Sequence, residues 1–580
     1  MFQQIKQQLA TSITQALEML GVAVPVTEKE FIAPPKPELG DLSFPCFTLS
    51  KSLGKNPAEI ARELAHTLQL PQGIASVEPA GPYLNFRLAK GEFTIETIST
   101  VLKEKSLFGT QPKNHTKIMI EYGSPNTHKE VHVGHLRNFA LGLSVVKLAE
   151  AAGYDVHKVN YLGDIGAHVA KWMWYFLKNK EDLAPKLTGK SITFGHIYTE
   201  ASKLADELPS AKDEIAETQR KLEARDSELH QLWLETRDEC LNQLDIIFKQ
   251  LGCEFEKTYL ESQVEEQGKI LARHLVEKGI AKEGDKGALI VDLESEKLGI
   301  FLVLKSDGSA LYSTKELALA GRKFADFPGI TKSIHVVDNR QSLYFKQLFK
   351  TLERMGFHEK MEHLAYDFVT LQEGAMSSRK GNIITYEDFR DEMLDRVTQE
   401  IRTRHTGHSE YPDWSDEKIQ DTAWIIAEAA MKFGMLKQDI NTPIVFNMDD
   451  AISFDGFTGP YIQYAHARLT SIIAKAGGVP TPTKTQNITS LSDNETEFAL
   501  AKKIAEFPEH ITQAANASAP NIIARYAFEL AQTINDFYRD TPVLNAEPED
   551  KARRLQLAEA ARITIQNALA LLGIKAPQEM

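Results

Sequence analysis

Apolar and polar positions follow two different periods along this chain, and the change from one period to the other marks its elements. A short apolar run, Lys117–Tyr122, is typical of a buried strand. From Leu136 onward, apolar residues recur three and four positions apart, which predicts one buried helix face that should end near Gly153. A second strand-like run follows at 158–162. The pattern therefore predicts a strand, a helix and a second strand, the unit from which parallel sheets are built.

The first part of the chain reads as a separate unit, 1–112. A helical pattern at 5–20 precedes a proline-rich segment at 33–41, and a strand-like run follows at 80–88. This mixture predicts a small α+β domain.

The rest of the chain divides at changes of period and charge. We expect an α/β domain of Rossmann type at 113–390, interrupted by a helical insertion at about 172–255 that is rich in Glu, Lys and Arg. A helical junction at 391–450 and an all-α domain at 451–580 complete the predicted organisation.

Length and composition narrow the possible classes. The chain has 580 residues, of which 42% are apolar and 25% charged. Roughly three or four ordered domains are therefore expected. No run of about 18 apolar residues predicts a membrane span, and the first residues read as an amphipathic helix rather than a signal peptide. The scattered cysteines, Cys46, Cys240 and Cys253, predict a reducing, cytoplasmic setting without disulfides or structural zinc.

Two histidines lie on the turn between the first predicted strand and its helix. His132 and His135 are three residues apart, so their rings face the same side of the first helical turn and can reach phosphate oxygens. Gly134 between them would let a flat adenine or ribose pack against the backbone. Two capping or solvated histidines are the alternative interpretation of these residues alone.

The residues around this turn resemble the HIGH signature of class I aminoacyl-tRNA synthetases, in the form found in arginyl-tRNA synthetases. The matching positions are Glu121, Ser124, Asn126, Lys129, His132, Gly134, His135, Leu136, Arg137 and Asn138. A second stretch, 376–382, resembles the KMSKS loop, which in that family closes on the ATP phosphates. The resemblance implies ATP contacts from His132, Gly134, His135, Met376, Ser377 and Ser378.

The second signature departs from the usual pattern in its cations. Ala375 and Ser378 stand where that pattern has its two lysines, and Arg379 and Lys380 follow. In many arginyl enzymes a lysine before the HIGH motif is thought to replace the missing one, and Lys129 has that place. The resemblance therefore implies catalytic roles for His132 and His135, and leaves Lys129, Arg379 and Lys380 as alternative catalytic cations.

An arginine substrate requires planar, paired acceptors, because a guanidinium is best held by bidentate carboxylates. The resemblance implies that this pocket is lined by Glu261, Tyr312, Glu316 and Gln341. It also implies that the α-amino and α-carboxylate groups of the substrate are held by Glu121, Ser124, Asn126 and His132. Most relatives have Asp at the position of Glu316, and the extra methylene shifts the carboxylate by about a bond length. A bystander glutamate on a helix is the alternative for any one of these residues.

The outer domains carry further positions of interest. The N-terminal unit resembles the additional domain of arginyl-tRNA synthetases, which implies that Tyr83 and Asn85 read unstacked bases of the tRNA D-loop. The C-terminal unit resembles the DALR anticodon-binding domain, which implies tRNA contacts at Tyr461, Tyr464, Arg468 and Met580. A core tyrosine beside a satisfied amide is the alternative for the first pair, and core packing for the tyrosines of the second group.

A glycine-bearing turn follows the second predicted strand. Its Asp164 stands in a loop that lines the active site in the family, and a helix-cap or turn residue is the alternative.

The resemblance covers nearly the whole chain and implies a two-step ligase. Arginine would be activated with ATP, accompanied by Mg²⁺, and the arginyl group passed to the terminal adenosine of tRNA(Arg). We expect no resident metal, no membrane association and a monomeric, cytoplasmic protein. The net charge of −14 opposes RNA binding unless basic side chains gather on one face.

Two other classes compete with this interpretation. A synthetase-derived binding or regulatory protein would keep the fold without the reaction, but the two histidines, Gly134 and the Ser-Arg-Lys loop argue against it. A cysteinyl or methionyl relative would need zinc-ligand clusters and would lack the tyrosine–carboxylate pattern.

Overall fold

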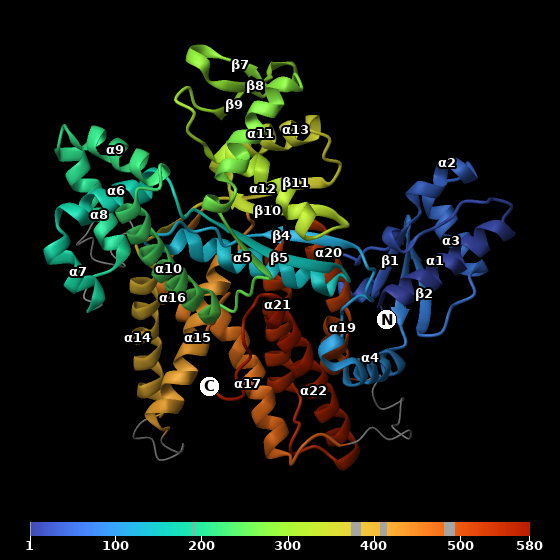
Figure 1. Ribbon diagram of the computed structural model, residues 1–580. Coiled ribbons are helices and arrows are strands. Elements are labelled where there is room, and N and C mark those ends of the chain that lie inside the picture. The colour runs from blue at the N-terminus through green and yellow to red at the C-terminus, as the bar shows by residue number, and fades with distance from the viewer. Residues whose placement is uncertain (1, 190–191, 373–383, 406–413, 481–493) are drawn as a thin grey trace.

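The computed structural model of the chain describes residues 2–189, 192–372, 384–405, 414–480 and 494–580. A parallel sheet occupies the middle of the molecule, with the insertion helices to one side and the N-terminal domain to the other (Figure 1). A small antiparallel sheet stands above the central sheet, and the C-terminal helices lie below it.

The central sheet has five parallel strands in the part of the chain that the structure describes. In spatial order they are β11 (Lys360–Tyr366), β10 (Ile330–Asp338), β4 (Lys117–Glu121), β5 (Asp155–Leu162) and β6 (Lys257–Leu260). Chain order reverses beside β4, so the crevice beyond its carboxyl end is where a doubly wound sheet binds its ligand. The predicted Rossmann-like fold is confirmed.

Helices and a small sheet connect these strands. Helix α5 (Val133–Ala151) joins β4 to β5, and α13 (Ser342–Arg354) joins β10 to β11. The connection from β5 to β6 is α6 (Ala167–Lys178), α7 (Lys180–Thr188), α8 (Phe194–Glu207), α9 (Ala211–Glu223) and α10 (Ser227–Gln250). The connection from β6 to β10 is α11 (Glu265–Glu277), the antiparallel strands β7 (Lys282–Glu283), β8 (Leu289–Leu293) and β9 (Gly299–Leu304), and α12 (Tyr312–Asp326).

The insertion helices form their own hydrophobic core around Trp172, Phe176, Phe194 and Trp233. His128, in the turn after β4, belongs to the boundary of that core. Its ring nitrogens lie 2.9 Å from the hydroxyls of Thr127 and Thr236. Burial lowers the pKa of His128 to about 3, so this histidine is neutral and joins the turn to α10.

The N-terminal domain is α+β, as the sequence predicts. Its elements are α1 (Phe2–Met19), β1 (Leu42–Pro45), α2 (Ser50–Leu53), α3 (Pro57–Thr67), β2 (Ile74–Ala80), β3 (Tyr83–Leu88) and α4 (Lys90–Glu104). The strands form an antiparallel sheet in the order β1-β3-β2. The strand-like run at 80–88 is thus the second arm of a hairpin, with its turn at Gly81–Pro82.

Where the structure describes it, the C-terminal part is helical apart from one short strand pair, β12 (Val369–Leu371) with β13 (Ile444–Phe446). Its helices are α14 (Tyr386–His405), α15 (Asp416–Leu436), α16 (Met448–Ile452), α17 (Gly459–Lys475), α19 (Glu495–Ala505), α20 (Phe507–Ala517), α21 (Pro520–Asp540) and α22 (Pro548–Leu571). One hydrophobic core is continuous from α5 through α15, α17, α21 and α22. The helical part therefore packs directly on the helix that begins at the histidine pair.

Short 3-10 helices complete the described elements: η1 (Glu28–Glu30), η2 (Pro37–Leu39), η3 (Cys46–Leu49), η4 (Lys105–Leu107), η5 (Glu261–Gln263), η6 (Asp285–Gly287), η7 (Glu294–Glu296) and η8 (Asn339–Gln341).

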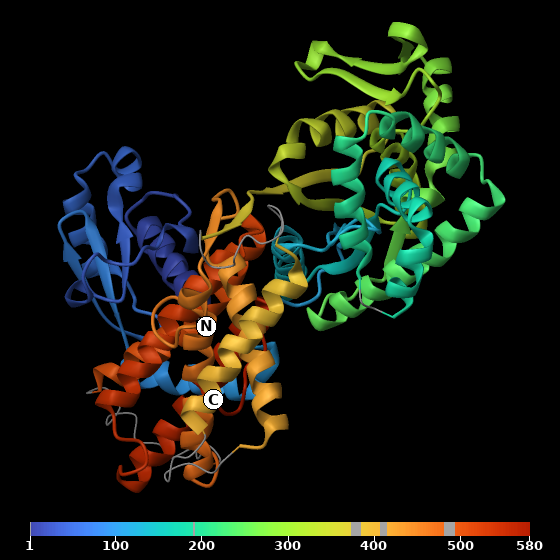
Figure 2. The same cartoon turned by 90° about the vertical axis from the view of Figure 1, so that its left-hand side faces the viewer.

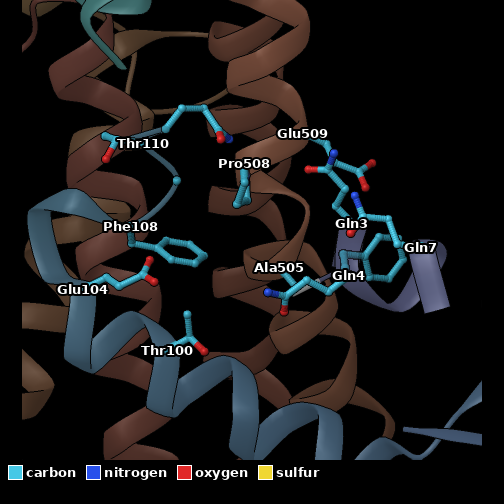
Figure 3. A pocket seen from close by; sticks show the side chains of 13 residues that line it. Gln3, Gln4, Gln7, Thr100, Glu104, Phe108, Thr110, Ala505, Pro508 and Glu509 are labelled. Carbon is cyan, nitrogen blue, oxygen red and sulfur yellow. The ribbon is translucent and has the colours of Figure 1, made fainter. Parts of the chain in front are cut away.

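The N-terminal domain rests on α19 and α20, away from the insertion (Figure 2). Lys6 pairs with Glu509 at 2.8 Å, and Asp41 with Lys502 at 3.0 Å. A cavity of about 410 Å³ lies at this joint, between α1, α4 and α20. Most of the side chains that surround it are polar, and Phe108 is one of the apolar ones (Figure 3). It shares no lining residue with the crevice beyond β4.

A buried lysine of α15 joins three parts of the fold. The ammonium of Lys432 donates to the carbonyl of Leu251 at 2.9 Å and to that of Gly573 at 2.7 Å, and it pairs with Glu428 at 2.5 Å. Leu251 ends α10 and Gly573 follows α22. One cation therefore holds the insertion, the helical junction and the C-terminal tail together.

Lys432→Met should lower the unfolding free energy by about 3–5 kcal/mol, because it leaves the Glu428 carboxylate buried without its cation. Lys418→Met is the matched control, since Lys418 pairs with Glu579 at the surface, where a pair contributes at most about 1 kcal/mol. The measurement is the melting temperature of both variants by calorimetry. Equal shifts in the two variants would contradict the role of Lys432.

Candidate active site

The turn after β4 is anchored by a side chain of the helix that it leads into. Asn138 of α5 accepts the N–H of Gly123 at 2.5 Å. Its amide donates to the carbonyl of Val336 at 2.7 Å and to the hydroxyl of Tyr366 at 3.1 Å. Asn138 is buried, so the start of α5 is fixed against both β10 and β11.

The two histidines at the start of α5 cap the helix and each other. The Nδ1 atom of His132 accepts the N–H of Gly134, and the Nδ1 atom of His135 accepts the N–H of His132, both at 3.1 Å. The ring centroids are 3.9 Å apart. Because each Nδ1 is an acceptor, these hydrogen bonds assign the ring proton to Nε2 in the neutral form.

Both histidines are held neutral. Burial lowers the pKa of His132, and Arg340 and Lys129 lower it further. Burial also lowers the pKa of His135 well below its usual value, with His132 and Lys129 adding to the effect. Each ring therefore has one N–H donor, on Nε2, and carries no charge at neutral pH.

Gly134 is required by the motif itself. A Cβ at this position would lie 2.9 Å from Cε1 of His132, so a larger residue would displace that ring. The ring of His132 covers the side of Gly134 from which a side chain would project. This contact explains the glycine without the adenine or ribose that the sequence suggested.

Met376, Ser377, Ser378, Arg379 and Lys380 lie outside the described residues. The chain returns at Ile384, and Thr385 forms an antiparallel bridge with His132. The N–H of Tyr386 donates to the carbonyl of Val131 at 2.7 Å. The second signature therefore joins the described chain directly beside the histidine turn.

A buried arginine attaches the other end of that segment to α5. Arg137 donates to the carbonyls of Asp367 at 2.6 Å, Ile440 at 3.1 Å and Thr442 at 3.1 Å. These carbonyls precede β12 and β13, so one guanidinium holds the base of the strand pair. Its sequence signal is an arginine inside a helix that is otherwise apolar on nearly every side.

Lys129 is the one candidate cation that falls among the described residues. Its ammonium lies 5.0 Å from the ring centroid of Tyr198 in α8, between the insertion and the histidine turn. Its effect on the pKa of both His132 and His135 places its charge near their rings.

Glu121 ends β4 inside a buried ionic cluster. Its carboxylate pairs with Lys323 of α12, and its other oxygen lies 3.4 Å from Nδ1 of His335 in β10. Burial acts to raise the pKa of Glu121, but Lys323 and His335 outweigh it and lower that pKa to about 2. The carboxylate is therefore ionised and already engaged by the protein, which the motif alone does not reveal.

Glu261 follows β6 and is paired as well. Its Oε2 atom lies 2.7 Å from the ammonium of Lys315, a residue of α12. Asp164 holds the turn that carries Glu261, because its carboxylate accepts the N–H of Ser262 at 2.9 Å and its hydroxyl at 2.6 Å. The side chain of Asp164 thus joins the turn after β5 to the turn after β6.

Glu316 lies between these two pairs. Burial raises its pKa to about 8, and the neighbouring charges of Glu121 and Glu261 add to the rise although Lys323 opposes it. The hydroxyls of Tyr161 and Tyr344 are buried beside the three carboxylates and have no hydrogen-bond partner among the described residues. We call these five residues, Glu121, Glu261, Glu316, Tyr161 and Tyr344, the acidic cluster.

The other predicted pocket residues lie at its margin. Tyr312 is 58% exposed at the start of α12, and Gln341 is exposed in η8. Ser124 is exposed, whereas Asn126 forms a bridge with Gly163, where a Cβ would be 2.1 Å from the Asn126 amide oxygen. Sequence reasoning assigned no pocket role to Lys315, Lys323, His335, Tyr161 and Tyr344, because their partners in the pocket lie far away in the chain.

In the N-terminal domain the two predicted base-reading residues differ in access. Tyr83 packs edge-on against Phe47 with ring centroids 5.6 Å apart, and Phe47 is 53% exposed. Asn85 is 4% exposed, because the segment before β1 crosses this face of β3. There Asp41 donates its N–H to the carbonyl of Phe86 at 2.8 Å. The base-reading roles of Tyr83 and Asn85 stay predictions.

The predicted residues of α17 lie together, facing α21. The amide of Asn535 donates to the hydroxyl of Tyr461 at 2.9 Å. Arg468 donates to the hydroxyl of Tyr464 at 3.1 Å, and its guanidinium lies 4.8 Å from the centroid of that ring and 4.7 Å from the centroid of Tyr538. Met580 packs half-buried against the core of the helical domain.

Within the described ranges, no three His, Cys, Asp or Glu side chains are grouped to hold a metal ion. No described helix is both long and apolar enough to cross a membrane.

Family models match three parts of the chain. "Arginyl tRNA synthetase N terminal domain" matches residues 6–88, "tRNA synthetases class I (R), catalytic domain" matches 97–448, and "DALR anticodon binding domain" matches 462–580. Together they leave only residues 1–5, 89–96 and 449–461 unmatched.

Whole-chain relatives agree with these matches. An arginine–tRNA ligase of Bdellovibrio bacteriovorus is 35% identical and covers 95% of this chain and 94% of its own. One of Clostridium beijerinckii is 35% identical and covers 99% of this chain and all of its own. The solved arginyl-tRNA synthetase of Thermus thermophilus is similar over 99% of both chains, with a TM-score of 0.78 and 28% identity. The chain therefore belongs to the arginyl-tRNA synthetase family of class I tRNA synthetases.

Proposed function

We propose that this chain joins L-arginine to tRNA(Arg) in two steps, with MgATP as a substrate. The arginine carboxylate attacks the α-phosphorus and pyrophosphate leaves. A ribose hydroxyl of the terminal adenosine of tRNA, the 2′ one by class I analogy, then attacks the arginyl carbonyl and AMP leaves. The observation that supports this most is the acidic cluster beside a neutral histidine pair at the carboxyl end of β4.

The ATP side of the site is the start of α5. The Nε2–H groups of His132 and His135 are fixed donors, because the Nδ1 atoms of the two rings already accept backbone N–H groups. Such donors stabilise charge that develops on phosphate oxygens without reorganising during the reaction. Lys129 adds a positive charge here, and Arg379 and Lys380 would add theirs from the second signature. Mg²⁺ arrives with the phosphates, since oxygen ligands on phosphate suit it.

The amino-acid side is the acidic cluster. A guanidinium placed there would meet the carboxylates of Glu261 and Glu316 and the hydroxyls of Tyr161 and Tyr344. These hydroxyls would gain partners that the protein does not supply. Because Glu121 is engaged by Lys323, the α-amino and α-carboxylate groups fall to Ser124, Asn126 and His132.

The tRNA would lie across the two outer domains. Phe47 with Tyr83 offers an aromatic surface for an unstacked base, and Tyr464, Arg468 and Tyr538 offer a second one. Cys46, Cys240 and Cys253 are buried and unpaired within the described chain, which supports a reducing cytoplasm. We expect a monomer.

The direct test is tRNA charging with each of the amino acids, with and without ATP. Arginine should be attached to the tRNA, and only when ATP is present. Charging of another amino acid, or none, would overturn the proposal.

His135→Ala should slow arginine activation about 10²-fold or more, since one donor to a transition-state oxyanion is worth roughly 3 kcal/mol. The readout is tRNA-dependent pyrophosphate exchange, with melting temperature as a check on folding. His157→Ala is the control, because His157 lies in β5 outside the crevice, where it pairs with Glu256. Unchanged exchange in His135→Ala would reject the role of the histidine pair.

Arginine should bind more tightly as the pH rises from about 6.5 to about 8.5. In the free protein the raised pKa of Glu316, about 8, leaves this carboxyl mostly protonated at neutral pH, whereas a guanidinium favours the ionised form. Binding should therefore release a proton, which calorimetry in buffers of different ionisation enthalpy detects. Glu316→Gln should remove the pH dependence, and Glu316→Asp should keep it. An affinity that is constant over this range would exclude Glu316 from the guanidinium contact.

Tyr464→Ala should raise the KM for tRNA about 5- to 100-fold, because a base stacked on an aromatic ring contributes roughly 1–3 kcal/mol. Tyr461→Ala should lower the melting temperature more, since Tyr461 packs against Phe528 and the helical core. Tyr526→Phe is a control on α21: its buried hydroxyl donates to the carbonyl of Lys503, so stability alone should change. If both alanine variants melt earlier with an unaltered KM, α17 does not read the RNA.

A further inference from the structure

A lysine of the protein already occupies one side of the proposed arginine pocket. The ammonium of Lys315 lies 2.7 Å from Oε2 of Glu261 and 3.7 Å from Oε2 of Glu265. The side chain of Lys315 is 7% exposed and that of Glu261 is 4% exposed. Buried ion pairs of this kind hold their geometry, because separating them leaves charges without solvent.

The pairing leaves one oxygen of Glu261 for a ligand. Its Oε1 atom faces Gly163 and Asn126: a Cβ on Gly163 would lie 3.2 Å from it. Lys315 is on the first turn of α12, next to Glu316 and one turn from Tyr312. The ammonium position at Glu261 is therefore filled from the same helix that presents the other pocket residues.

Guanidinium and ammonium groups respond differently to such an occupant. An ammonium is a compact, strongly hydrated charge that needs a carboxylate close by, and here it would share Glu261 with the ammonium of Lys315. A guanidinium is planar, less strongly hydrated and has five donors, so it can use the free oxygen of Glu261 together with Glu316 and the buried tyrosine hydroxyls. Like charges at one carboxylate thus penalise an amine more than a guanidinium.

We propose that Lys315 is a specificity-determining residue that excludes amino acids ending in an ammonium group, lysine and ornithine above all, by filling the ammonium position at Glu261. This inference rests on the proposed arginine pocket. Repulsion between the ammonium of Lys315 and that of a bound amine adds to the selectivity that comes from the attractive contacts with arginine.

The opposing possibility makes a different prediction. If Lys315 were a stand-in that arginine displaces, its removal would tighten arginine binding and leave the rejection of lysine as it is. If it excludes amines, its removal should mainly strengthen the binding of lysine and ornithine.

The experiment measures the dissociation constants of L-arginine, L-lysine and L-ornithine by calorimetry for the full chain and for Lys315→Met, and tRNA charging with each amino acid. The arginine-to-lysine affinity ratio should fall at least tenfold in Lys315→Met, mostly through tighter lysine binding, with misacylation by lysine becoming detectable. An unchanged ratio, or tighter arginine binding with lysine still rejected, would overturn the proposal.

Two further variants keep the outcome interpretable. Lys269→Met is the matched control, because Lys269 pairs with Glu265 and Glu266 on α11 and not with Glu261, so the ratio should not change. Lys315→Arg keeps a cation in place in case Lys315→Met does not fold. It should still reject lysine, and lysine binding by this variant would overturn the proposal.

Glu261→Gln separates the inference from the pocket on which it rests. If that variant binds arginine as the unaltered chain does, the pocket assignment has failed. If arginine binding weakens in Glu261→Gln but the ratio is constant in Lys315→Met, the pocket stands and the role of Lys315 has failed.

Discussion

The site depends on two buried lysines that one helix presents to the carboxyl ends of two strands. Lys315 and Lys323 lie two turns apart on α12 and pair with Glu261 after β6 and with Glu121 at the end of β4. Ionised carboxylates this deeply buried require a cation in contact, since desolvation otherwise drives them to the neutral form. Lys323 and His335 outweigh desolvation and lower the pKa of Glu121 to about 2. Desolvation outweighs Lys315 at Glu261, so the pKa of Glu261 is raised, as is that of Glu316. The position of α12 therefore decides which carboxylates in the pocket contact a cation.

Helix α5 is the second element that several functions share. Its first turn carries the histidine pair, Arg137 holds the strand pair that flanks the second signature, and its later turns pack into the core of the helical domain. A displacement of the C-terminal helices would therefore also shift α5, because close-packed interiors transmit strain. This gives a physical route by which an RNA contact far from the crevice could influence the phosphate site.

Local features of the fold were predictable because their causes lie within a few residues. The strand at 117–121, the helix that follows and the capping role of His132 depend on apolar periodicity and on helix-end hydrogen bonds. The Rossmann-like sheet, the helical insertion and the α+β and all-α domains follow from the same patterns and from the resemblance of the two signatures. For the carboxylates the residue types were predictable, but their protonation and partners were not.

By itself the sequence determined the fold class and the histidine turn, since these depend on short-range order. The acidic residues expected of an arginine pocket followed from the resemblance to arginyl-tRNA synthetases. The tertiary structure decided that Lys315 would meet Glu261, that Lys323 would meet Glu121, and that Asn85 would be covered by a neighbouring segment. These outcomes join residues far apart in the chain. Charge pairing and burial are properties of the packed interior, where distance in space rather than in sequence sets the interaction energy.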